Sequence, residues 1–429
     1  MGTLATDKGI LIAEGKTKKI WKRSDGLVCV ESKNDITAGD GAKHDEFEGK
    51  GILANTITCN VFQLLKDCGI SVAFIEQLNE TDFLAECCTQ IELEVIVRRE
   101  AQGSYLKRNP WIEKGEIFPN LIVEFDLKTS GRKWKGTDIP CDDPLMIFEG
   151  NIAKLYVPNV PLQSQEPFLV LDDYPLKDDH RRFEEIEQIA RETFLILEKA
   201  LQLEGGRLLD FKIEFGFNSK NQLRLSDVID CESWRATIDG KHIDKQGFRE
   251  GEEISETAKK YRQAVALTER FRIPKQQIVL WTGSPDDIVT EFKDALDMYF
   301  PGDHVLRVVR QTCSLHKEPM RAIKALTRFT QEIPDTVIIA FVGMSNGAGP
   351  TLSAHTSVPV LTVPATTKEF PDDVHSSLRT PSDVPVMTVL SPKNAALAAL
   401  NILAARNPAI YAKLHLRLEK RLMNVVAIG

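Results

Sequence analysis

The last third of the chain contains five short apolar runs that alternate with helical stretches, and this alternation restricts the possible folds more than any other feature. The runs predict strands over 278–282, 305–309, 336–342, 358–363 and 384–390. Because they are almost continuously apolar, they are typical of parallel strands that are covered on both faces. An Ala-rich helix is expected over about 393–406. The pattern predicts a doubly wound α/β domain with a parallel sheet.

The residues before 275 follow a different pattern, in which short β-rich segments mix with a few helices. The clearest helix is expected over 178–203, where apolar residues recur every three or four positions and a Gly-Gly pair follows. Further helices are expected over about 52–67 and 253–271, and the stretch 272–277 has a linker-like composition. A length of 429 residues favours more than one domain. We predict a first domain over 1–268, a linker over 269–277 and a second domain over 278–429.

The composition is that of a globular protein, with 42% hydrophobic residues, 27% charged residues and a formal net charge of −8. The negative charge argues against nucleic-acid binding, and no apolar run has the length of a membrane-spanning helix. The eight cysteines show no C-x-x-C motif and no zinc-site spacing. Since the N-terminus lacks a signal-peptide core and reduced thiols are typical of the cytosol, we expect a cytoplasmic protein.

The motif EGKT at 14–17 resembles the end of a nucleotide-binding P-loop, but its surroundings exclude that motif. A P-loop needs a glycine five positions before the glycine of this motif, where the chain has Ile10, and a long helix after it. The chain continues instead into two apolar runs separated by the turn S-D-G at 24–26, which predicts a β-hairpin. Such a loop can close over a triphosphate, with charge from Lys16 and Lys18. An ordinary basic hairpin is the alternative.

The stretch LLDFKIEFGF at 208–217 alternates charged and apolar residues, as a β-strand does. The charged face of this strand consists of Asp210, Lys212 and Glu214. A second expected strand at 222–230 carries Asp227 and Asp230, and pairing of the two strands would place Glu214 beside Asp227. Two carboxylates in basic surroundings suit Mg²⁺ that bridges nucleotide phosphates. A solvated charged face is the alternative.

Several cations and donors accompany these strands. Arg235 and Arg249 follow within 25 residues of the second strand, and guanidinium groups suit phosphates and carboxylates. The stretch 97–108 joins Arg98 to the Gly103-Ser104 turn, which is a possible anion cradle, and the Gly-rich loop 34–51 carries Lys43 and Lys50. Together these features indicate ATP, Mg²⁺ and an anionic substrate.

An ordered set of motifs over residues 8–265 resembles SAICAR synthetase (phosphoribosylaminoimidazole-succinocarboxamide synthetase). The motifs are EGKTK, ITAG followed by EGKG, VRRxAxGS, DFKIEFG, LSDVID followed by SWR, and DKxxFR. The resemblance implies an ATP-grasp-like α+β domain that joins L-aspartate to the carboxylate of CAIR (carboxyaminoimidazole ribonucleotide), with ATP cleaved to ADP and phosphate.

The same resemblance implies roles for individual residues. ATP would be bound by Gly15, Lys16, Lys18, Lys212 and Glu214, and Mg²⁺ by Glu214 and Asp227. CAIR and aspartate would be bound by Lys50, Arg98, Ser104, Arg235 and Arg249. Lys212 and Asp210 are the candidate catalytic residues of this domain.

The second domain has its own candidate site at the carboxyl ends of its strands, where ligands bind in such sheets. VLWTGSPDD at 279–287 predicts a strand, a tight turn and a helix start, where Ser284 and backbone N–H groups can hold a phosphate. Asp287 is placed for a ribose hydroxyl or an amine. His316 follows a strand and is either catalytic or structural. The Gly-rich loop in 341–360 either approaches a ligand or caps a helix.

Residues 277–429, including SSLRTPS at 376–382, resemble the animal, CO₂-using class of AIR carboxylase (phosphoribosylaminoimidazole carboxylase). That family adds CO₂ to C4 of the ring of AIR (aminoimidazole ribonucleotide) without ATP or biotin. The resemblance implies that His316 moves a proton and that the AIR and CO₂ site consists of Ser284, Asp287, Ser314, Lys317, Ser345, Asn346 and Gly347. Three positions depart from the pattern, namely Asp286, Leu315 and Met344. The carboxylate gained at Asp286 and the arginine lost at Met344 lower the expected affinity for an anion.

The two resemblances imply a bifunctional enzyme of purine biosynthesis that assembles as a homo-octamer, with small molecules as substrates and no nucleic-acid or membrane partner. Two alternatives stay open at this point. The second domain can be a catalytically silent oligomerisation domain on a synthetase, or the chain can be a nucleotide sensor without ligase activity.

Overall fold

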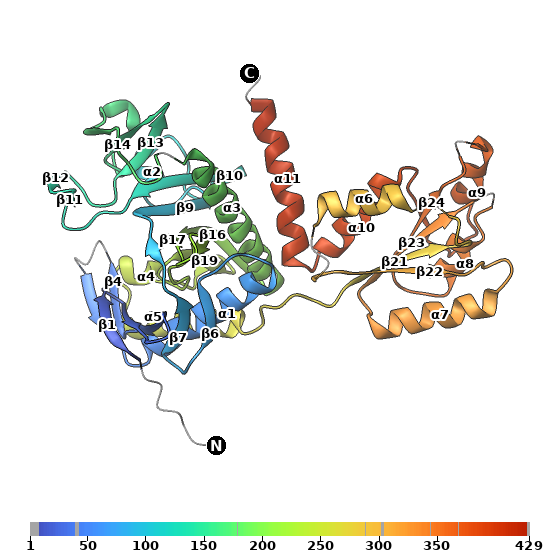
Figure 1. Cartoon of the computed structure of the whole chain (residues 1–429), viewed down its shortest axis with the longest axis horizontal. Helices are drawn as coiled ribbons and strands as arrows, with labels where there is room; N and C mark the ends of the chain where they lie inside the picture. The colour runs from blue at the N-terminus through green and yellow to red at the C-terminus, as the bar shows by residue number, and fades with distance from the viewer. Residues whose placement is uncertain are drawn as a thin grey trace, which may run out of the picture. The chain divides into compact units, whose positions relative to one another are not determined.

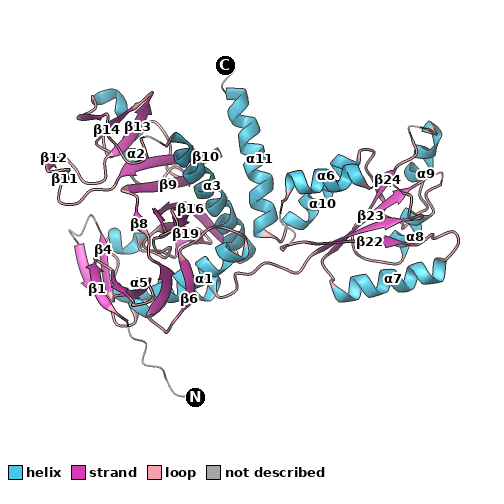
Figure 2. Cartoon of the chain, viewed as in Figure 1, coloured by secondary structure: helices cyan, strands magenta, loops and turns pink. Residues whose placement is uncertain are grey.

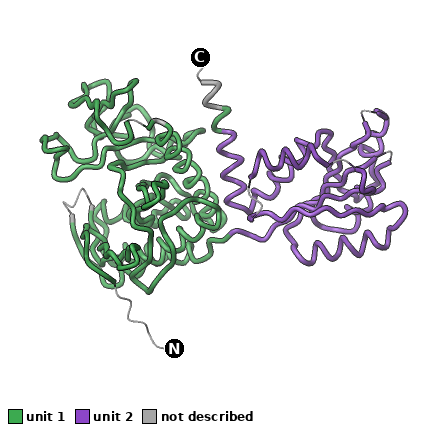
Figure 3. Tube along the Cα trace, in the orientation of Figure 1, with its two compact units in different colours: residues 1–272, 419–429 green, residues 273–418 purple. Residues whose placement is uncertain are grey.

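The computed structural model describes residues 8–38, 43–177, 179–287, 289–301, 304–343, 345–367 and 369–426. The chain forms two compact units (Figure 3), of which unit 1 comprises residues 1–272 and 419–429 and unit 2 comprises residues 273–418. Both units contain helices as well as strands (Figure 2). None of the helices in the described ranges has the length and apolar character that crossing a bilayer requires.

Unit 1 begins with a five-stranded antiparallel sheet in the order β1-β2-β3-β7-β6. Its strands are β1 (Ile10–Glu14), β2 (Lys18–Lys22), β3 (Leu27–Ser32), β6 (Phe74–Gln77) and β7 (Asp82–Glu86). The predicted hairpin is confirmed, since β2 and β3 pair directly across the turn at 24–26. Helix α1 (Lys50–Asp67) packs against β3 and β6, and its apolar side chains, such as Ile57 and Phe62, are buried.

A second sheet of unit 1 is antiparallel and eight-stranded, in the order β15-β14-β13-β10-β9-β16-β19-β20. The strands are β9 (Leu93–Glu100), β10 (Ile117–Leu127), β13 (Leu145–Glu149), β14 (Ile152–Tyr156), β15 (Leu169–Leu171), β16 (Gly206–Ile213), β19 (Trp234–Ile238) and β20 (Lys241–His242). Helix α3 (His180–Leu203) packs against β16 and β9. Its predicted apolar stripe is fully buried from Ile186 to Leu201, and each such side chain contributes about 1.5–3 kcal/mol to folding.

Smaller elements complete unit 1. They are β4 (Asp35–Ala38), β5 (Lys43–Glu46), β8 (Thr89–Gln90), β11 (Lys133–Trp134), β12 (Thr137–Asp138), β17 (Phe215–Phe217), β18 (Leu223–Leu225), α2 (Ser104–Arg108), α4 (Gln246–Arg249) and α5 (Ile254–Thr268). Helix α5, predicted over 253–271, packs against α1.

Two strand predictions in unit 1 need correction. The expected strand 208–217 is divided at Glu214 into β16 and β17, which belong to different sheets. The expected strand 222–230 is limited to β18, because the Asp227 side chain accepts a hydrogen bond from the N–H of Val228 and the chain turns away after Leu225. Asp227 and Asp230 therefore lie on a loop. The carbonyl of Glu214 still accepts a hydrogen bond from the N–H of Ser226, at 3.1 Å, so the loop starts beside Glu214.

Unit 2 confirms the doubly wound prediction. Its five-stranded sheet has the order β22-β21-β23-β24-β25, and every pairing is parallel. The strands are β21 (Gln277–Thr282), β22 (Arg307–Thr312), β23 (Thr336–Val342), β24 (Val360–Pro364) and β25 (Met387–Thr388). The last strand was predicted over 384–390, and it is short because Pro385 has no N–H for a ladder hydrogen bond.

Helices cover both faces of this sheet (Figure 1). They are α6 (Thr290–Tyr299), α7 (Pro319–Glu332), α8 (Ala348–Ala354), α9 (Val374–Leu378) and α10 (Pro392–Ala404), and α11 (Pro408–Val426) follows. One face packs Trp281 and Ala340 against Leu326 of α7 and Leu352 of α8. On the other face the ring of Phe292 in α6 lies 5.9 Å from that of Phe341, and α10 packs against α6. Because these helices cover the faces of the sheet, the loops that follow the strands remain available to form a site.

Candidate active sites

A cavity of about 950 Å³ in unit 1 collects the residues that the sequence singled out in the first domain. Those that line it are Gly15, Lys16, Lys18, Arg98, Ser104, Asp210, Lys212, Glu214, Asp227, Arg235 and Arg249. Lys50 is the exception, because its side chain is 1% exposed and forms an ion pair with Glu232 at 2.8 Å. Lys43 has a described backbone, but its side chain lies outside the description.

One end of the cavity carries the lysines and the two candidate metal ligands. Lys18 of β2 forms an ion pair with Asp227. Lys212 lies 2.5 Å from Glu94 and 3.2 Å from Glu214, and Lys128 also pairs with Glu214. The lysines and the carboxylates therefore neutralise one another.

The pKa values at this end record the same balance. Burial acts to raise the pKa of Glu214, but the charges of Lys212, Lys128 and Lys18 outweigh burial and lower it. Burial lowers the pKa of Lys18 to about 8. Burial also acts to lower the pKa of Lys212, but the charges of Glu94 and Glu214 outweigh burial and raise this pKa. Glu214 is therefore ionised and able to bind a cation.

The donor set at this end fits a magnesium ion that is shared with phosphates. Glu214 and Asp227 are oxygen ligands, and Mg²⁺ is commonly held by one or two carboxylates, with phosphates and water completing the octahedron. Within the described ranges no group of three His, Cys, Asp or Glu side chains is arranged to hold a metal ion.

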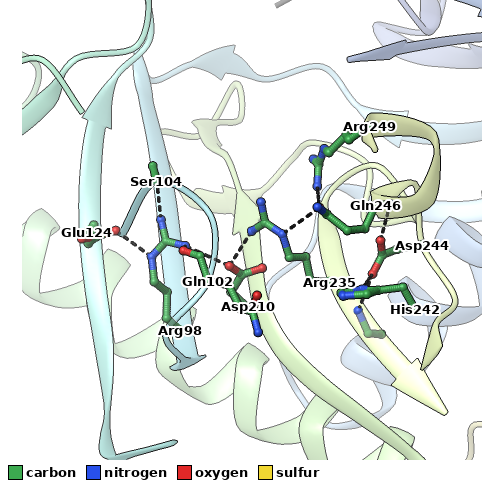
Figure 4. Close-up of polar contacts among 11 residues, drawn as sticks. Arg98, Gln102, Ser104, Glu124, Asp210, Arg235, His242, Asp244, Gln246 and Arg249 are labelled. Atoms are coloured by element: carbon green, nitrogen blue, oxygen red, sulfur yellow. Dashed lines mark hydrogen bonds and ion pairs between the residues drawn. The ribbon is translucent and has the colours of Figure 1, made fainter. Parts of the chain in front are cut away.

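The other end of the cavity is built around Arg98, Asp210 and Arg235, which lie in register on three neighbouring strands (Figure 4). Asp210 of β16 lies opposite Arg98 of β9 and Arg235 of β19. Its Oδ2 accepts hydrogen bonds from Arg98 at 2.8 Å and from Arg235 at 2.6 Å. Arg98 also donates to Glu124 at 2.8 Å and to Ser104 Oγ at 3.1 Å. Asp210 thus fixes the positions of two guanidinium groups.

Arg249 adds a positive charge with less compensation. Arg249 and Arg235 both donate to Gln246 Oε1, at 3.1 and 3.3 Å. Burial, followed by the charge of Arg235, lowers the pKa of Arg249. Two guanidinium groups that share a neutral acceptor in a cavity favour the binding of an anion.

Several residues of this cavity were not predicted from the sequence. They include Glu94, Lys128, Thr129 and Lys245. Lys128 directly follows the apolar stretch that becomes β10, so its position at a strand end was a usable signal. Lys245 stands in the DKxxFR motif. For Glu94 no local signal exists, because its position opposite Asp126 and beside Lys212 depends on the register of three strands.

In unit 2 the loops after β21, β22 and β23 carry the predicted residues. His316 Nε2 lies 3.3 Å from Ser345 Oγ. At Gly347 an added Cβ would lie 2.3 Å from His316 Nε2, so the backbone at Gly347 comes against the imidazole. The structure therefore brings His316, Ser345 and Gly347 together. Lys317 is exposed and Ser314 is partly exposed on the same loop as His316.

The loop 283–287 differs from its prediction. Helix α6 starts at Thr290 rather than directly after the turn. The backbone N–H groups of Gly283 and Ser284, expected to face a ligand, donate to Asp287 Oδ2 at 2.8 and 3.0 Å. Asp287 closes its own loop in this way because its carboxylate lies three residues after Ser284 in a tight turn.

Asn346 has a structural contribution that the sequence left open. Its Oδ1 accepts from the N–H of Gly349 at 2.7 Å, and its Nδ2 donates to Ser377 Oγ at 3.1 Å. These contacts tie the first turn of α8 to the SSLRTPS segment. Among the departures, Asp286 is exposed and Leu315 packs into the core of unit 2. Met344 lies outside the described residues.

Comparisons with known proteins agree with these two sites. A family model described as SAICAR synthetase matches residues 11–149 and 168–266, and one described as AIR carboxylase matches residues 277–422. A multifunctional protein of Gallus gallus is 33% identical over 95% of this chain and 92% of its own length. The Homo sapiens bifunctional phosphoribosylaminoimidazole carboxylase/phosphoribosylaminoimidazole succinocarboxamide synthetase is 32% identical over 95% of this chain and 92% of its own length.

A solved structure adds to these likenesses. The phosphoribosylaminoimidazole-succinocarboxamide synthase of Ehrlichia chaffeensis is 26% identical with a TM-score of 0.50, and the match covers 61% of this chain and all of that chain. The matched models follow one another along the chain, and relatives that carry both names match it almost end to end. The chain therefore belongs to the family of bifunctional phosphoribosylaminoimidazole carboxylase/SAICAR synthetases.

Proposed function

We propose that this chain catalyses two successive steps of purine biosynthesis. A carboxylase domain over 278–429 adds CO₂ to AIR and forms CAIR, and a synthetase domain over 1–268 joins CAIR to L-aspartate with cleavage of ATP to ADP and phosphate. The observation that carries the proposal is the unit 1 cavity, where ionised carboxylates among lysines meet a row of arginines.

The synthetase reaction needs both ends of that cavity. The carboxylate of CAIR is a poor acyl donor, because its leaving group would be oxide. Transfer of the terminal phosphoryl group of ATP to it gives an acyl phosphate, and attack by the aspartate amine then expels phosphate and forms the amide. Lys16, Lys18, Lys128 and Lys212 line the cavity and would offset the charge of the phosphates. No covalent bond to the enzyme is required.

Magnesium would be held by Glu214 and Asp227, and when bound it supplies positive charge to the phosphates. Arg98, Arg235 and Arg249 would bind the phosphate and carboxylates of CAIR or the aspartate. Because Asp210 holds Arg98 and Arg235 in place before substrate arrives, less ordering is needed on binding.

In unit 2 the reaction needs no ATP and no biotin. The enamine-like C4 of the AIR ring attacks CO₂, and the C4 proton must then leave. His316 would take that proton, since an imidazole exchanges protons near neutral pH. Ser345 Oγ, 3.3 Å from Nε2, would orient the ring. Relatives that carry both activities in their names support this interpretation over a silent oligomerisation domain.

The chain would act as a homo-octamer in the cytoplasm. Large apolar side chains exposed on unit 2 support an assembly through this unit, for example Met320 at 70%, Leu390 at 61% and Leu378 at 60% exposure. The net charge of −8 supports small molecules rather than nucleic acid as partners.

The proposal is tested by Glu214→Gln in the full chain. We expect ADP release that depends jointly on CAIR and aspartate to fall by about 100-fold or more, because a ligand for the metal is lost. Glu86→Gln is the matched control, since Glu86 pairs with Arg224 at 2.9 Å and is absent from the cavity lining. Synthesis by Glu214→Gln at the parental rate would overturn the metal role. Parental protein without ADP release would overturn the synthetase function itself.

A further inference from the structure

Arg310 is a charged residue of unit 2 to which neither the motifs nor the proposed mechanism gives a role. Its side chain lies over the loop 283–287. Nη2 donates to three backbone carbonyl oxygens of this loop, those of Ser284 at 3.2 Å, Pro285 at 2.8 Å and Asp287 at 2.9 Å. Nε donates to Thr282 Oγ1 at 3.3 Å. One guanidinium group therefore joins the end of β21 to the loop that follows it.

The register of the sheet places Arg310 there. In the parallel pairing of β22 with β21, Arg310 lies opposite Leu280, two residues before the end of each strand. The strand ends are joined by a contact of 2.9 Å between the hydroxyls of Thr282 and Thr312. Because β22 is the edge strand, the long side chain of Arg310 can reach across the end of β21. A neutral side chain of the same length would lack both the positive charge and the several N–H donors of a guanidinium group.

The loop that Arg310 holds has an unfavourable charge for an anionic ligand. Asp286 and Asp287 are adjacent in it, and Asp287 already accepts the hydrogen bonds of two loop N–H groups. A phosphate near Ser284 would meet two negative charges at short range. Arg310 brings a positive charge to the same loop and also fixes its shape by three carbonyl contacts.

We propose that Arg310 is a positioning residue of the carboxylase site, which holds the loop 283–287 and offsets its carboxylates so that the loop accepts the phosphate of a nucleotide. The inference rests on the proposed function of unit 2, because it assumes that AIR binds at this loop. We therefore expect Arg310 to affect mainly the affinity for the phosphorylated ligand, and to affect the rate of the chemical step less.

The test compares Arg310→Gln and Arg310→Lys with Arg307→Gln in the full chain. Arg307 is the matched control, since it lies on the same strand and pairs with Glu332 at 2.6 Å at the opposite end. For Arg310→Gln we expect the KM for AIR to rise about tenfold or more, with kcat within about threefold of the parent. Arg310→Lys should recover part of the loss, and Arg307→Gln should match the parent. Synthesis of SAICAR from supplied CAIR should be unchanged in all variants.

Direct measurements of AIR binding distinguish the role of Arg310 from the proposed carboxylase function. Calorimetry with SAICAR present to fill the unit 1 site would measure the Kd of AIR and of its riboside, which lacks the phosphate. Arg310→Gln should weaken AIR by about tenfold and the riboside by less than about twofold. Equal weakening of both ligands, or an unchanged Kd for AIR in a folded variant, would overturn the role of Arg310. A parent that binds AIR without forming CAIR would overturn the carboxylase function alone, and a parent that binds no AIR would overturn both.

Discussion

At the scale of single residues, Asp210 organises the substrate end of the unit 1 cavity. Its side chain is buried and accepts hydrogen bonds from Arg98 and Arg235, which come from strands on either side of its own. A buried carboxylate between two guanidinium groups is stable only while the charges remain balanced. This arrangement explains how a negatively and a positively charged side chain can both lie on one face of β16 although that face is not open to solvent.

Asp210→Asn keeps the shape of this side chain and removes its charge. Because Arg98 is almost fully buried, the variant should lose about 3 kcal/mol of unfolding free energy, and its synthetase kcat/KM should fall by at least about tenfold. Chemical denaturation and a synthetase assay measure both effects. Glu204→Gln breaks the exposed pair with Arg270 and should cost less than about 1 kcal/mol. Equal losses in the two variants would contradict the role of Asp210.

Asp126 gives a prediction of pH dependence. It lies opposite Glu94 in the β9–β10 pairing. Burial is the first cause that raises its pKa well above the ordinary value, followed by the charges of Glu124 and Glu94, while Arg98 and Arg108 act in the opposite direction. A carboxyl whose pKa is raised by folding contributes most at low pH, and stability is lost as pH rises from about 4 through the folded pKa.

Asp126→Asn removes this titration. The unfolding free energy of the variant should therefore exceed that of the parent by an amount that grows as pH rises above about 4. Denaturant titrations at several pH values between 5 and 9 measure the difference. A difference that shrinks with increasing pH would show that Asp126 is stabilising in its charged form.

At the scale of elements, each candidate site includes a loop that neighbouring strands hold in place. The loop of EGKT joins β1 to β2 and delivers Lys16 and Lys18 to the cavity without a following helix, as the hairpin interpretation predicted. In unit 2 the loop 343–347 leaves β23 and comes against His316. The close approach depends on the absence of a side chain at Gly347, whose backbone has an ordinary negative φ of −78°.

Gly347→Ala tests this loop. An added methyl group would stand 2.3 Å from His316 Nε2, so either the imidazole or the loop must move. Carboxylase activity should fall by at least about tenfold, with a loss of about 1–3 kcal/mol in unfolding free energy. Gly343→Ala is the control, because its Cβ would meet the nearest atom, Thr366 Cγ2, at 3.8 Å. Full activity of Gly347→Ala would contradict the placement of His316 in the site.

At the scale of the whole molecule, each unit contains its own core and its own candidate site. The residues proposed for the synthetase site all precede residue 250, and those proposed for the carboxylase site all follow residue 283. The two activities should therefore be separable by single substitutions in the full chain, while the order of the reactions makes CAIR their common intermediate.

His316→Asn should lower carboxylation of AIR by about 100-fold or more and leave the ligation of supplied CAIR at the parental rate. Glu214→Gln should have the reciprocal effect. A mixture of the two variants should convert AIR to SAICAR, since CAIR can pass through solution. His355→Asn is the control for His316, because His355 is exposed and contacts the carbonyl of Thr351. Failure of His316→Asn to ligate supplied CAIR would show that the units do not act independently.

The sequence by itself determined the features that depend on neighbouring positions along the chain. The apolar runs of β21, β23 and β24, the stripe of α3 and the hairpin of β2 and β3 all follow from local periodicity and turn residues. The ordered motifs also predicted eleven of the residues that line the unit 1 cavity, among them Lys18, Glu214 and Arg235. Local patterns failed at the strand 384–390 and at 222–230, where a proline and an aspartate turn end the pairing.

Only the tertiary structure decided which side chains meet across strands that are distant in sequence. Arg98, Asp210 and Arg235 form one row because β9, β16 and β19 are neighbours in a particular register. Register also puts Glu94 beside Lys212. Tertiary packing outside the strands buries Lys50 of helix α1 against Glu232 and places Leu315, on the loop after β22, in the core. Arg310 reaches the loop 283–287 for the same reason. Pairing between strands is set by the packing of the whole sheet, and no short stretch of sequence contains that information.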